Sequence, residues 1–600
     1  MPIRRAFVLT AVFCLISSPV QAQVSLLNET YNAPGNTSVK VDAVFAPSAQ
    51  QGSTPFRISI SNQSGKDRTW KVKIGDSHSR KLSTEVIESI LVEDGAVVTR
   101  EIYLPLAPLF TTYTYRNIRV NITSSGLGQL TRSVSHETND IFPTIGISEA
   151  LARRSLRELN EEVNNRARSD TRFALPYLPE QLPINWRGYS SLDCLLIDLK
   201  SWEGLNDAQT RSILEWVRMG GRLDIFAPES EKNLAIYDLE IDGFQTRVNK
   251  PQSRQLSLGQ VHLKKWDENQ LKVSIVDDYT KIDETPRRSS ELENYFGSDW
   301  NLRSEFGEKK FNPGLILIPL LIFAIVVAPV NLFHFAKKGQ RHRLFYTTPI
   351  ISVAACLIIV VIIFLEDGLG GRGYRATFAD IQSQPGEMRL YLTQEQVSRT
   401  GVVLQSGFDA NAEMVMDPVE LPNSVFNPLS SSSARNIAYH FNDQRYGGGF
   451  FHSRSEQGFS IRSSQPTRAR IEMTESRTGG ANPSLISSLP VAVTSLYFRG
   501  ADGKIWATPE NAIILPGSPI YLEPSSNAAY RNWLKESTEF FSKALGKRIL
   551  TLAEERGRYF AIPKSAGSFT IASHPSIDWE RELVVLSGMA LNTQPSSKDE

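Results

Sequence analysis

The sequence predicts a multidomain α+β membrane protein, and three observations lead to this fold class. Two long apolar stretches without charged residues lie near the middle of the chain. Alternating apolar and polar residues, which are typical of strands, recur before and after these stretches. A strand–helix–strand pattern lies between the first strand-rich region and the first apolar stretch. Because 600 residues are too many for one hydrophobic core, we expect roughly three to five domains.

The N-terminus has the three parts of a secretory signal peptide, which we place at residues 1–22. Arg4 and Arg5 supply positive charge, residues 6–16 are apolar, and Ala22 ends a small-residue cleavage site. The alternative is an uncleaved anchor. In both cases we expect the residues that follow to be exported.

Residues 23–142 predict a β-sandwich domain of immunoglobulin-like type. Apolar and polar residues alternate at 56–62, and a turn separates this segment from a second strand at 69–74. Further alternation occurs at 97–104 and 115–122. Short strands with turns at this spacing are typical of such sandwiches, which usually bind or space other domains.

Residues 143–308 predict an α/β domain. Ser148 is a suitable N-cap for a helix that runs to about residue 168. A buried strand at 192–198 is followed by a helix at 207–219, two glycines and a second strand at 222–228. This order is typical of a parallel sheet with crossover helices.

One motif in this domain resembles a known family. The helix that ends in Trp-Val-x-x-Gly-Gly-x-Leu, at residues 216–223, resembles the class I glutamine-amidotransferase-like fold. The order of regions also resembles uncharacterised bacterial membrane proteins with β-sandwich regions, such an α/β domain and paired spans. Those spans include a Pro-Val-Asn turn, here at residues 329–331. An active amidotransferase of this class needs a cysteine directly after the strand that ends at Phe226, where this chain has Ala227. The resemblance therefore implies a degenerate domain that keeps the fold without the chemistry.

Residues 311–336 and 344–365 predict two transmembrane helices. Neither contains Asp, Glu, Lys or Arg, and each reaches the ~20 residues that a helix needs to cross ~30 Å of hydrocarbon. The turn between them, residues 337–343, carries four basic residues: Lys337, Lys338, Arg341 and Arg343. The positive-inside rule places this turn in the cytoplasm. We therefore expect a two-pass protein of the bacterial inner membrane, with large N- and C-terminal domains on the periplasmic side.

Residues 374–600 predict an extracytoplasmic, mainly-β region. Residues 387–392, 469–473 and 492–498 are typical of strands, and one amphipathic helix at about 527–545 interrupts them. The sequence leaves open whether this region packs against the domains that precede the spans.

The candidate ligand-binding residues follow from the predicted α/β sheet. Ligands of open α/β sheets bind beyond the carboxyl ends of the strands. The polar residues expected there are Asp198, Ser201, Glu229 and Ser230. Cys194 lies within a strand, where a thiol is usually a small buried hydrophobe, so we expect no catalytic residue. His440 and His452 flank a glycine-rich loop without a metal-ligand spacing, so we expect no metal site and no cofactor.

The composition argues against two further classes of protein. A net charge of +1, without basic runs that interleave with aromatics, gives no reason to expect a nucleic-acid partner. The three cysteines, Cys14, Cys194 and Cys356, lie in separate regions, so we expect neither disulfides nor a cysteine-based zinc site.

These features predict a non-catalytic, membrane-anchored binding or assembly component. Its partners would be the membrane and a protein of the inner membrane or periplasm. The resemblance to the bacterial membrane proteins implies a place in a bacterial envelope complex, with a role accessory to a transporter as one form of it. Two alternatives stay open. One is an extracytoplasmic ligand-binding receptor, and the other is a hydrolase whose site combines residues distant in the sequence.

Overall fold

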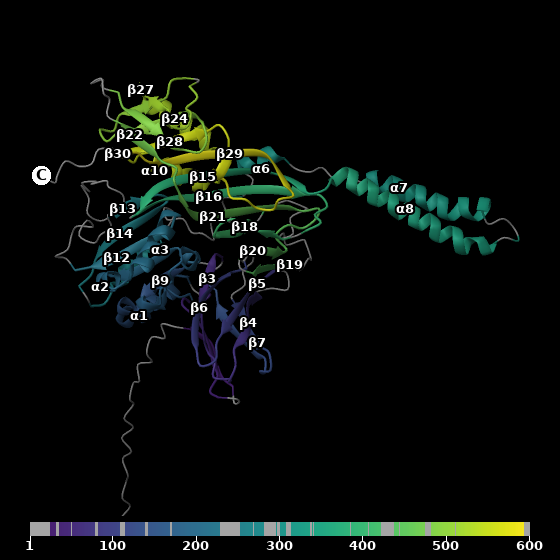
Figure 1. Ribbon diagram of the computed structural model, residues 1–600, viewed down its shortest axis with the longest axis horizontal. Helices are drawn as coiled ribbons and strands as arrows, with labels where there is room; N and C mark the ends of the chain where they lie inside the picture. Colours follow the sequence, from purple (N-terminus) through teal and green to yellow (C-terminus); the bar gives the residue numbers. More distant parts are fainter. Residues whose placement is uncertain are drawn as a thin grey trace, which may run out of the picture.

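In the computed structural model more of the described residues lie in strands than in helices, and a pair of apolar helices projects from the β-rich body (Figure 1). The fold is mixed α+β, as the sequence predicts. The predicted signal peptide, residues 1–22, lies outside the described residues. The structure describes residues 24–592 except 32–34, 50, 78–81, 108–114, 139–141, 168–170, 229–252, 268, 281–295, 297–299, 308–313, 336–338, 340, 385, 406, 420, 422–436, 443, 475–481 and 511.

The chain begins with a four-stranded antiparallel sheet in the order β1-β2-β3-β6. Its strands are β1 (Val24–Thr30), β2 (Ser38–Ala43), β3 (Ser53–Ser61) and β6 (Val97–Pro105). Phe56, Ile58 and Ile60 of β3 are fully buried, and partly exposed residues alternate with them. This burial has the period of two that the sequence predicts for the strand.

A seven-stranded sheet joins the two halves of the chain, in the order β17-β20-β19-β5-β4-β7-β8. The strands that precede the helix pair are β4 (Arg68–Ser77), β5 (Leu82–Val92), β7 (Tyr115–Ser124) and β8 (Leu130–Glu137). Those that follow it are β17 (Phe408–Asp409), β19 (Ile437–Asn442) and β20 (Arg445–Gly448). β5 and β19 pair in parallel, from Leu82 beside Ile437 to Ile87 beside Asn442. The two halves, whose contact the sequence left open, therefore share one sheet.

The α/β region is built on a six-stranded sheet in the order β10-β9-β11-β12-β14-β13, in which only the edge strand β13 runs antiparallel. Its strands are β9 (Ile145–Ser148), β10 (Leu175–Tyr177), β11 (Cys194–Asp198), β12 (Arg222–Ala227), β13 (Ser253–Leu256) and β14 (Gly259–Lys265). Its helices are α1 (Glu149–Ala167), α2 (Leu199–Glu203), α3 (Asp207–Arg218) and α4 (Val276–Thr280).

The predicted helix between β11 and β12 is α3, and local chemistry sets its ends. The side chain of Asn206 accepts the N–H of Gln209 at 3.0 Å, and the side chain of Gln209 accepts the N–H of Asn206 at 3.2 Å. This reciprocal capping box satisfies two donors of the first turn. Beyond the helix, Gly220 has a φ of 107°, a conformation that L side chains rarely adopt. The predicted cap and glycine stop are confirmed.

The helix pair consists of two apolar helices long enough to cross a membrane. The first comprises α7 (Gly314–Ile325) and a π-helical segment, η5 (Val326–Phe335), and the second is α8 (Leu344–Asp367). The π-helical segment contains Pro329, which lacks the N–H that a regular helix requires. Of the four basic turn residues, Arg341 and Arg343 lie in a short 3-10 helix, η6 (Arg341–Arg343). Lys337 and Lys338 lie outside the described residues.

A nine-stranded sheet dominates the region after the helix pair, in the order β18-β21-β16-β15-β29-β28-β24-β25-β27. Its strands are β15 (Gly371–Gln384), β16 (Glu387–Thr400), β18 (Met414–Val419), β21 (Glu456–Thr467), β24 (Val493–Arg499), β25 (Ile505–Ala507), β27 (Glu523–Ser525), β28 (Arg558–Pro563) and β29 (Ile577–Met589). A small sheet beside it contains β22 (Ile471–Thr474), β23 (Ser484–Ser487), β26 (Pro519–Tyr521) and β30 (Leu591–Asn592). The helix α6 (Asn301–Phe306) contacts β15 and β16.

The single helix predicted at about 527–545 is two helices, α9 (Asn527–Thr538) and α10 (Lys543–Leu552). Ser526 and Ser542 are their N-caps. The break follows from Ser542, whose side chain accepts the N–H of Leu545 at 3.4 Å. Its own N–H and hydroxyl donate to the buried carboxylate of Glu395 on β16, at 2.6 and 2.5 Å. A contact with a strand far away in the sequence therefore ends the helical run.

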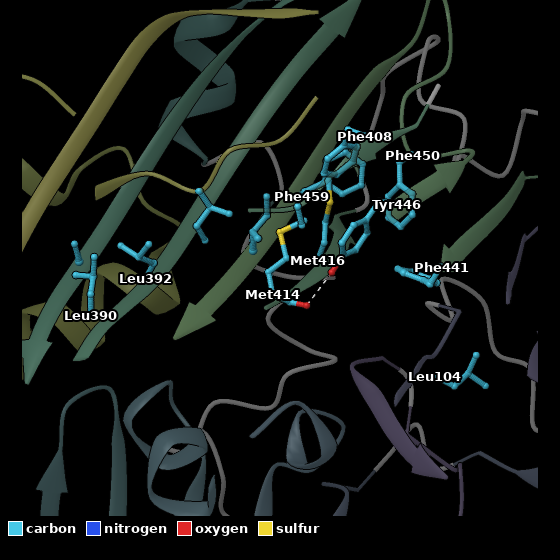
Figure 2. Close-up of a cluster of buried hydrophobic side chains, with 14 of the residues drawn as sticks. Leu104, Leu390, Leu392, Phe408, Met414, Met416, Phe441, Tyr446, Phe450 and Phe459 are labelled. Atoms are coloured by element: carbon cyan, nitrogen blue, oxygen red, sulfur yellow. Dashed lines mark hydrogen bonds between the residues drawn. The ribbon is translucent and has the colours of Figure 1, made fainter. Parts of the chain in front are cut away.

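Side chains from both halves of the chain meet in one hydrophobic core (Figure 2). Leu104 of the N-terminal half lies in the same cluster as Leu390, Phe441 and Phe450 of the C-terminal half. The aromatic rings contact one another, and the Tyr446 hydroxyl donates to the Met414 carbonyl at 2.9 Å (Figure 2). The shared core and the shared sheet make the two halves one folded body.

The α/β region also contacts the nine-stranded sheet directly. The guanidinium of Arg389 on β16 lies 3.1 Å from the carboxylate of Glu215 on α3. The Ser257 hydroxyl, at the turn between β13 and β14, donates to Asp380 of β15. Asp380 in turn accepts from Arg558 of β28 at 2.7 Å, and both side chains are buried. The docked position of the α/β region therefore depends on polar contacts between distant segments.

Candidate functional site

The predicted ligand-binding residues lie at the carboxyl end of β11 and beyond β12. Asp198 ends β11, is 3% exposed and caps α2. Its Oδ1 accepts the N–H of Ser201 at 2.9 Å, and its Oδ2 accepts the hydroxyl of Ser148 at 2.8 Å. Both carboxylate oxygens are therefore bound within the protein, and Ser201 is half-buried beside them. Glu229 and Ser230 lie outside the described residues.

A buried polar cluster surrounds Asp224 on β12. Arg222 donates to both carboxylate oxygens, at 2.8 and 3.0 Å. The Tyr279 hydroxyl on α4 donates to Oδ2 at 2.5 Å, and Nζ of Lys264 on β14 lies 3.1 Å from the same oxygen. Lys264 also contacts the exposed Asp278, at 2.9 Å. The cluster holds β12, β14 and α4 together.

The charges in the cluster decide which of its groups are ionised. Burial would raise the pKa of Asp224, but Arg222 and Lys264 outweigh burial and lower this pKa to about 2. Burial raises the pKa of the Cys194 thiol, and the charge of Asp224 raises it further. Burial lowers the pKa of His262. At neutral pH the carboxylate is therefore a weak base and the thiol is protonated, which suits neither general-base nor thiolate chemistry.

A hollow of about 620 Å³ opens beyond the carboxyl ends of β12 and β14, next to the cluster. Lys264 belongs to both, because its side chain contacts Asp224 and also lines the hollow. The lining residues are Phe226, Pro228, Lys264, Lys265, Trp266, Asp267, Gln270, Leu271, Lys272, Ser274, Ile275 and Asp278. The sequence predicts a ligand at this edge of the sheet, but Asp198 and Ser201 do not line the hollow. The run Lys264-Lys265-Trp266, directly after an alternating strand pattern, is the sequence signal that could have identified it.

A smaller cavity of about 70 Å³ lies where the α/β region meets the nine-stranded sheet and α10. Charged and polar side chains from all three contribute to its lining, among them Asp193, Glu395, Arg462 and Arg548. Its volume suits a few water molecules, since one water occupies ~30 Å³ in the liquid. The cavity is therefore a small polar junction between these three parts of the fold.

The histidines weighed as metal ligands have other surroundings. The His440 imidazole lies 3.6 Å from the Glu85 carboxylate on the neighbouring strand, while the His452 carbonyl accepts the Thr400 hydroxyl. Asp443, between the two histidines, lies outside the described residues. Within the described part of the chain, no group of three or more His, Cys, Asp or Glu residues could hold a metal ion.

Comparisons with known proteins add little to this description. No protein-family model and no curated protein matches the chain. Among solved structures, the ApaA protein of Bordetella pertussis matches at 13% identity over 18% of this chain and 94% of its own, with a TM-score of 0.13. β-Glucuronidase 2 of Bacteroides uniformis matches at 10% identity, over 34% of this chain and 24% of its own, with a TM-score of 0.14. The β-D-mannosidase of Dictyoglomus thermophilum matches at 9% identity, over 85% and 76%, with a TM-score of 0.15. Similarities at these TM-scores carry no argument.

Proposed function

We propose that this protein is a non-catalytic, membrane-anchored binding or assembly component of a bacterial envelope complex. The observation that carries the proposal is the parallel pairing of β5 with β19. It builds one body from the chain segments on both sides of the helix pair, so the body is attached to both helices. An attachment at two points limits rotation of the body about either helix. A body held in this way suits a component that contacts a neighbouring protein in the same membrane.

The helix pair supports the membrane part of the proposal. Its buried polar residue, Asn331, accepts the Thr347 hydroxyl at 2.6 Å and donates to the Thr348 hydroxyl at 3.0 Å. Because these polar groups are satisfied between the two helices, the outward faces are left to exposed apolar side chains, which suit lipid or partner helices. Arg341 and Arg343 at the far turn favour a cytoplasmic turn, with the body on the periplasmic side.

The α/β region supports a binding role over a catalytic one. Its sequence resembles a class I amidotransferase-like domain, but Ala227 stands where such an enzyme has its cysteine. The remaining thiol, Cys194, is buried with a raised pKa, as expected for a residue with a packing role.

The test is affinity purification of the tagged full-length protein from membranes in mild detergent, followed by mass spectrometry. We expect a reproducible inner-membrane or periplasmic partner that is lost when residues 311–365 are replaced by an unrelated helical hairpin. Limited proteolysis of the replacement variant checks that its body still folds. A protein that purifies alone would count against the assembly role.

The hollow beside Lys264 favours an extracytoplasmic ligand-binding receptor as the second candidate. Its lining combines the aromatic Trp266 with basic residues, among them Lys265 and Lys272, and with the acidic residues Asp267 and Asp278, which suits a small molecule that has an apolar part and a charged group. A saturable rise in the Tm of the protein with such a molecule, abolished by Trp266→Ala, would favour this function. A panel of aromatic carboxylates and phosphates without effect on the Tm would argue against it.

A further inference from the structure

The chain leaves α8 close to the level where a membrane changes from hydrocarbon to headgroups. Leu365 is the last residue of the apolar run, and Glu366 and Asp367 complete the helix. Gly368 follows, three residues beyond Leu365, which corresponds to a rise of ~4.5 Å along a helix. The interfacial layer on each side of a bilayer is roughly 5–7 Å thick. If Leu365 marks the hydrocarbon boundary, Gly368 and Leu369 lie in the headgroup layer.

Two further loops are hydrogen-bonded to this exit point. The N–H of Val402 donates to the Gly368 carbonyl at 3.0 Å, and the N–H of Gly370 donates to the Val402 carbonyl at 2.9 Å. The N–H of Arg454 donates to the carbonyl of Gly401 at 2.8 Å. The loop at residues 401–405 and the loop around Arg454 are therefore held beside the end of α8.

Two leucines are exposed at this edge. Leu404 is 87% exposed and Leu369 is 68% exposed. The loop that carries Leu404 is supported on both sides. The N–H of Val403 donates to the Ser453 hydroxyl at 2.9 Å, and a ring nitrogen of the buried His574 lies 2.5 Å from the Gln405 carbonyl. The position of Leu404 is therefore built into the fold.

A basic residue accompanies the leucines. Arg454 is exposed and has a φ of 57°, a conformation that is uncommon outside glycine. Its main chain is bonded to the loop that carries Leu404. An exposed arginine on a loop that is bonded to the leucine-bearing loop suits a lipid headgroup, because arginine binds phosphate oxygens with two parallel donors.

We propose that Leu369, Leu404 and Arg454 form a membrane ledge that enters the lipid headgroup layer beside α8. The inference rests on the proposed membrane anchoring and adds a third contact with the bilayer to the two helices. The helix pair alone is a stalk about which the body can tilt. A contact between the ledge and the headgroups limits this tilt.

The test uses the full chain in nanodiscs of phosphatidylethanolamine and phosphatidylglycerol with a headgroup-level nitroxide lipid. A thiol-reactive fluorophore is attached at Leu404→Cys or, separately, at Leu369→Cys, in a Cys14→Ala and Cys356→Ala background. Cys194 is buried and does not compete for the label. The matched control is Leu515→Cys, a leucine that is 57% exposed near the small sheet of β22 and β30. That sheet lies at the end of the body away from the helix pair (Figure 1).

We expect the nitroxide lipid to quench the labels at positions 404 and 369 several-fold more than the label at position 515. Equal quenching at all three positions, in protein that resists carbonate extraction, would overturn the ledge and leave the membrane anchoring intact. Protein that is released from membranes by carbonate would overturn both the ledge and the membrane anchoring. Two ledge positions keep the test decisive where one substitution disturbs its loop.

Discussion

Asp224 is a fully buried carboxylate that is contacted by three donor groups, on Arg222, Lys264 and Tyr279. Burial opposes its ionised form, and the two cations more than offset that cost, since they lower its pKa to about 2. Removal of its charge is costly, because it leaves the half-buried Arg222 without its counter-ion and leaves Lys264 with only Asp278. The ion pairs and hydrogen bonds of this cluster therefore connect β12, β14 and α4. Residues of the same three elements line the neighbouring hollow.

We predict that Asp224→Asn lowers the free energy of unfolding by about 3–5 kcal/mol, because breaking a buried ion pair leaves an uncompensated charge. Chemical unfolding of the purified protein in detergent, followed by circular dichroism, measures the change. Asp278→Asn is the matched control, since this aspartate contacts the same lysine from an exposed position. We expect it to cost less than about 1 kcal/mol. Equal effects of the two substitutions on the free energy of unfolding would contradict a stabilising role of the buried Asp224 carboxylate.

At the level of the element, α9 and α10 show how a tertiary contact divides an amphipathic run. Both helices begin at a serine N-cap, but only the second cap touches a buried charge. Ser542 donates twice to Glu395 and lies 3% exposed, whereas Ser526 caps α9 at the surface. The contact with Glu395 fixes where α10 begins and attaches it to the nine-stranded sheet.

Ser542→Ala should therefore destabilise the protein by about 2–4 kcal/mol, since it removes both a cap and a hydrogen bond to a buried carboxylate. Ser526→Ala removes a cap alone and should cost about 1 kcal/mol. The difference in the free energy of unfolding between the two variants isolates the contribution of the hydrogen bond from the Ser542 hydroxyl to Glu395, since the backbone N–H of residue 542 still donates to Glu395 in the alanine variant. A difference of zero would show that the hydroxyl hydrogen bond contributes nothing.

At the level of the whole molecule, the chain passes through the helix pair and returns to complete a sheet that it had already begun. The strands β5 and β19 are separated in sequence by the α/β region and both helices, yet they pair over six residues each. Contacts of such long sequence separation carry a large loop-closure entropy and form slowly. The seven-stranded sheet is therefore complete only when the residues beyond the helix pair have joined it.

A disulfide between the two halves tests this arrangement. Glu85 and His440 are paired across β5 and β19, where neighbouring strands lie ~4.8 Å apart, within the ~4.4–6.8 Å that a disulfide spans. In a Cys356→Ala background, the double variant Glu85→Cys and His440→Cys should form a crosslink under oxidising conditions. After cleavage at a protease site inserted beside Gly339, the halves should migrate together on a denaturing gel until a reductant separates them. Glu85→Cys alone is the control, and halves that separate without reductant would contradict the shared sheet.

The candidate site shows the limit of the sequence argument. The general rule for open α/β sheets indicates the edge at which the hollow lies. It does not indicate which strand contributes, because β14 joins the sheet beside β12 only through a pairing of distant residues. Lys264 and Trp266 therefore line the hollow, while the Asp198 carboxylate is hydrogen-bonded as the N-cap of α2.

The sequence by itself determined the features that depend on spacing within one segment. Examples are the alternation in β3, the Asn206 cap of α3 and the two charge-free stretches, since burial period, capping and span length are local properties. Only the tertiary structure decided which distant segments meet: β5 with β19, Ser542 with Glu395, and Asp224 with Lys264. The partner of a strand edge or of a buried charge is whichever complementary surface the complete fold brings next to it. The spacing of residues within one segment does not determine which surface that is.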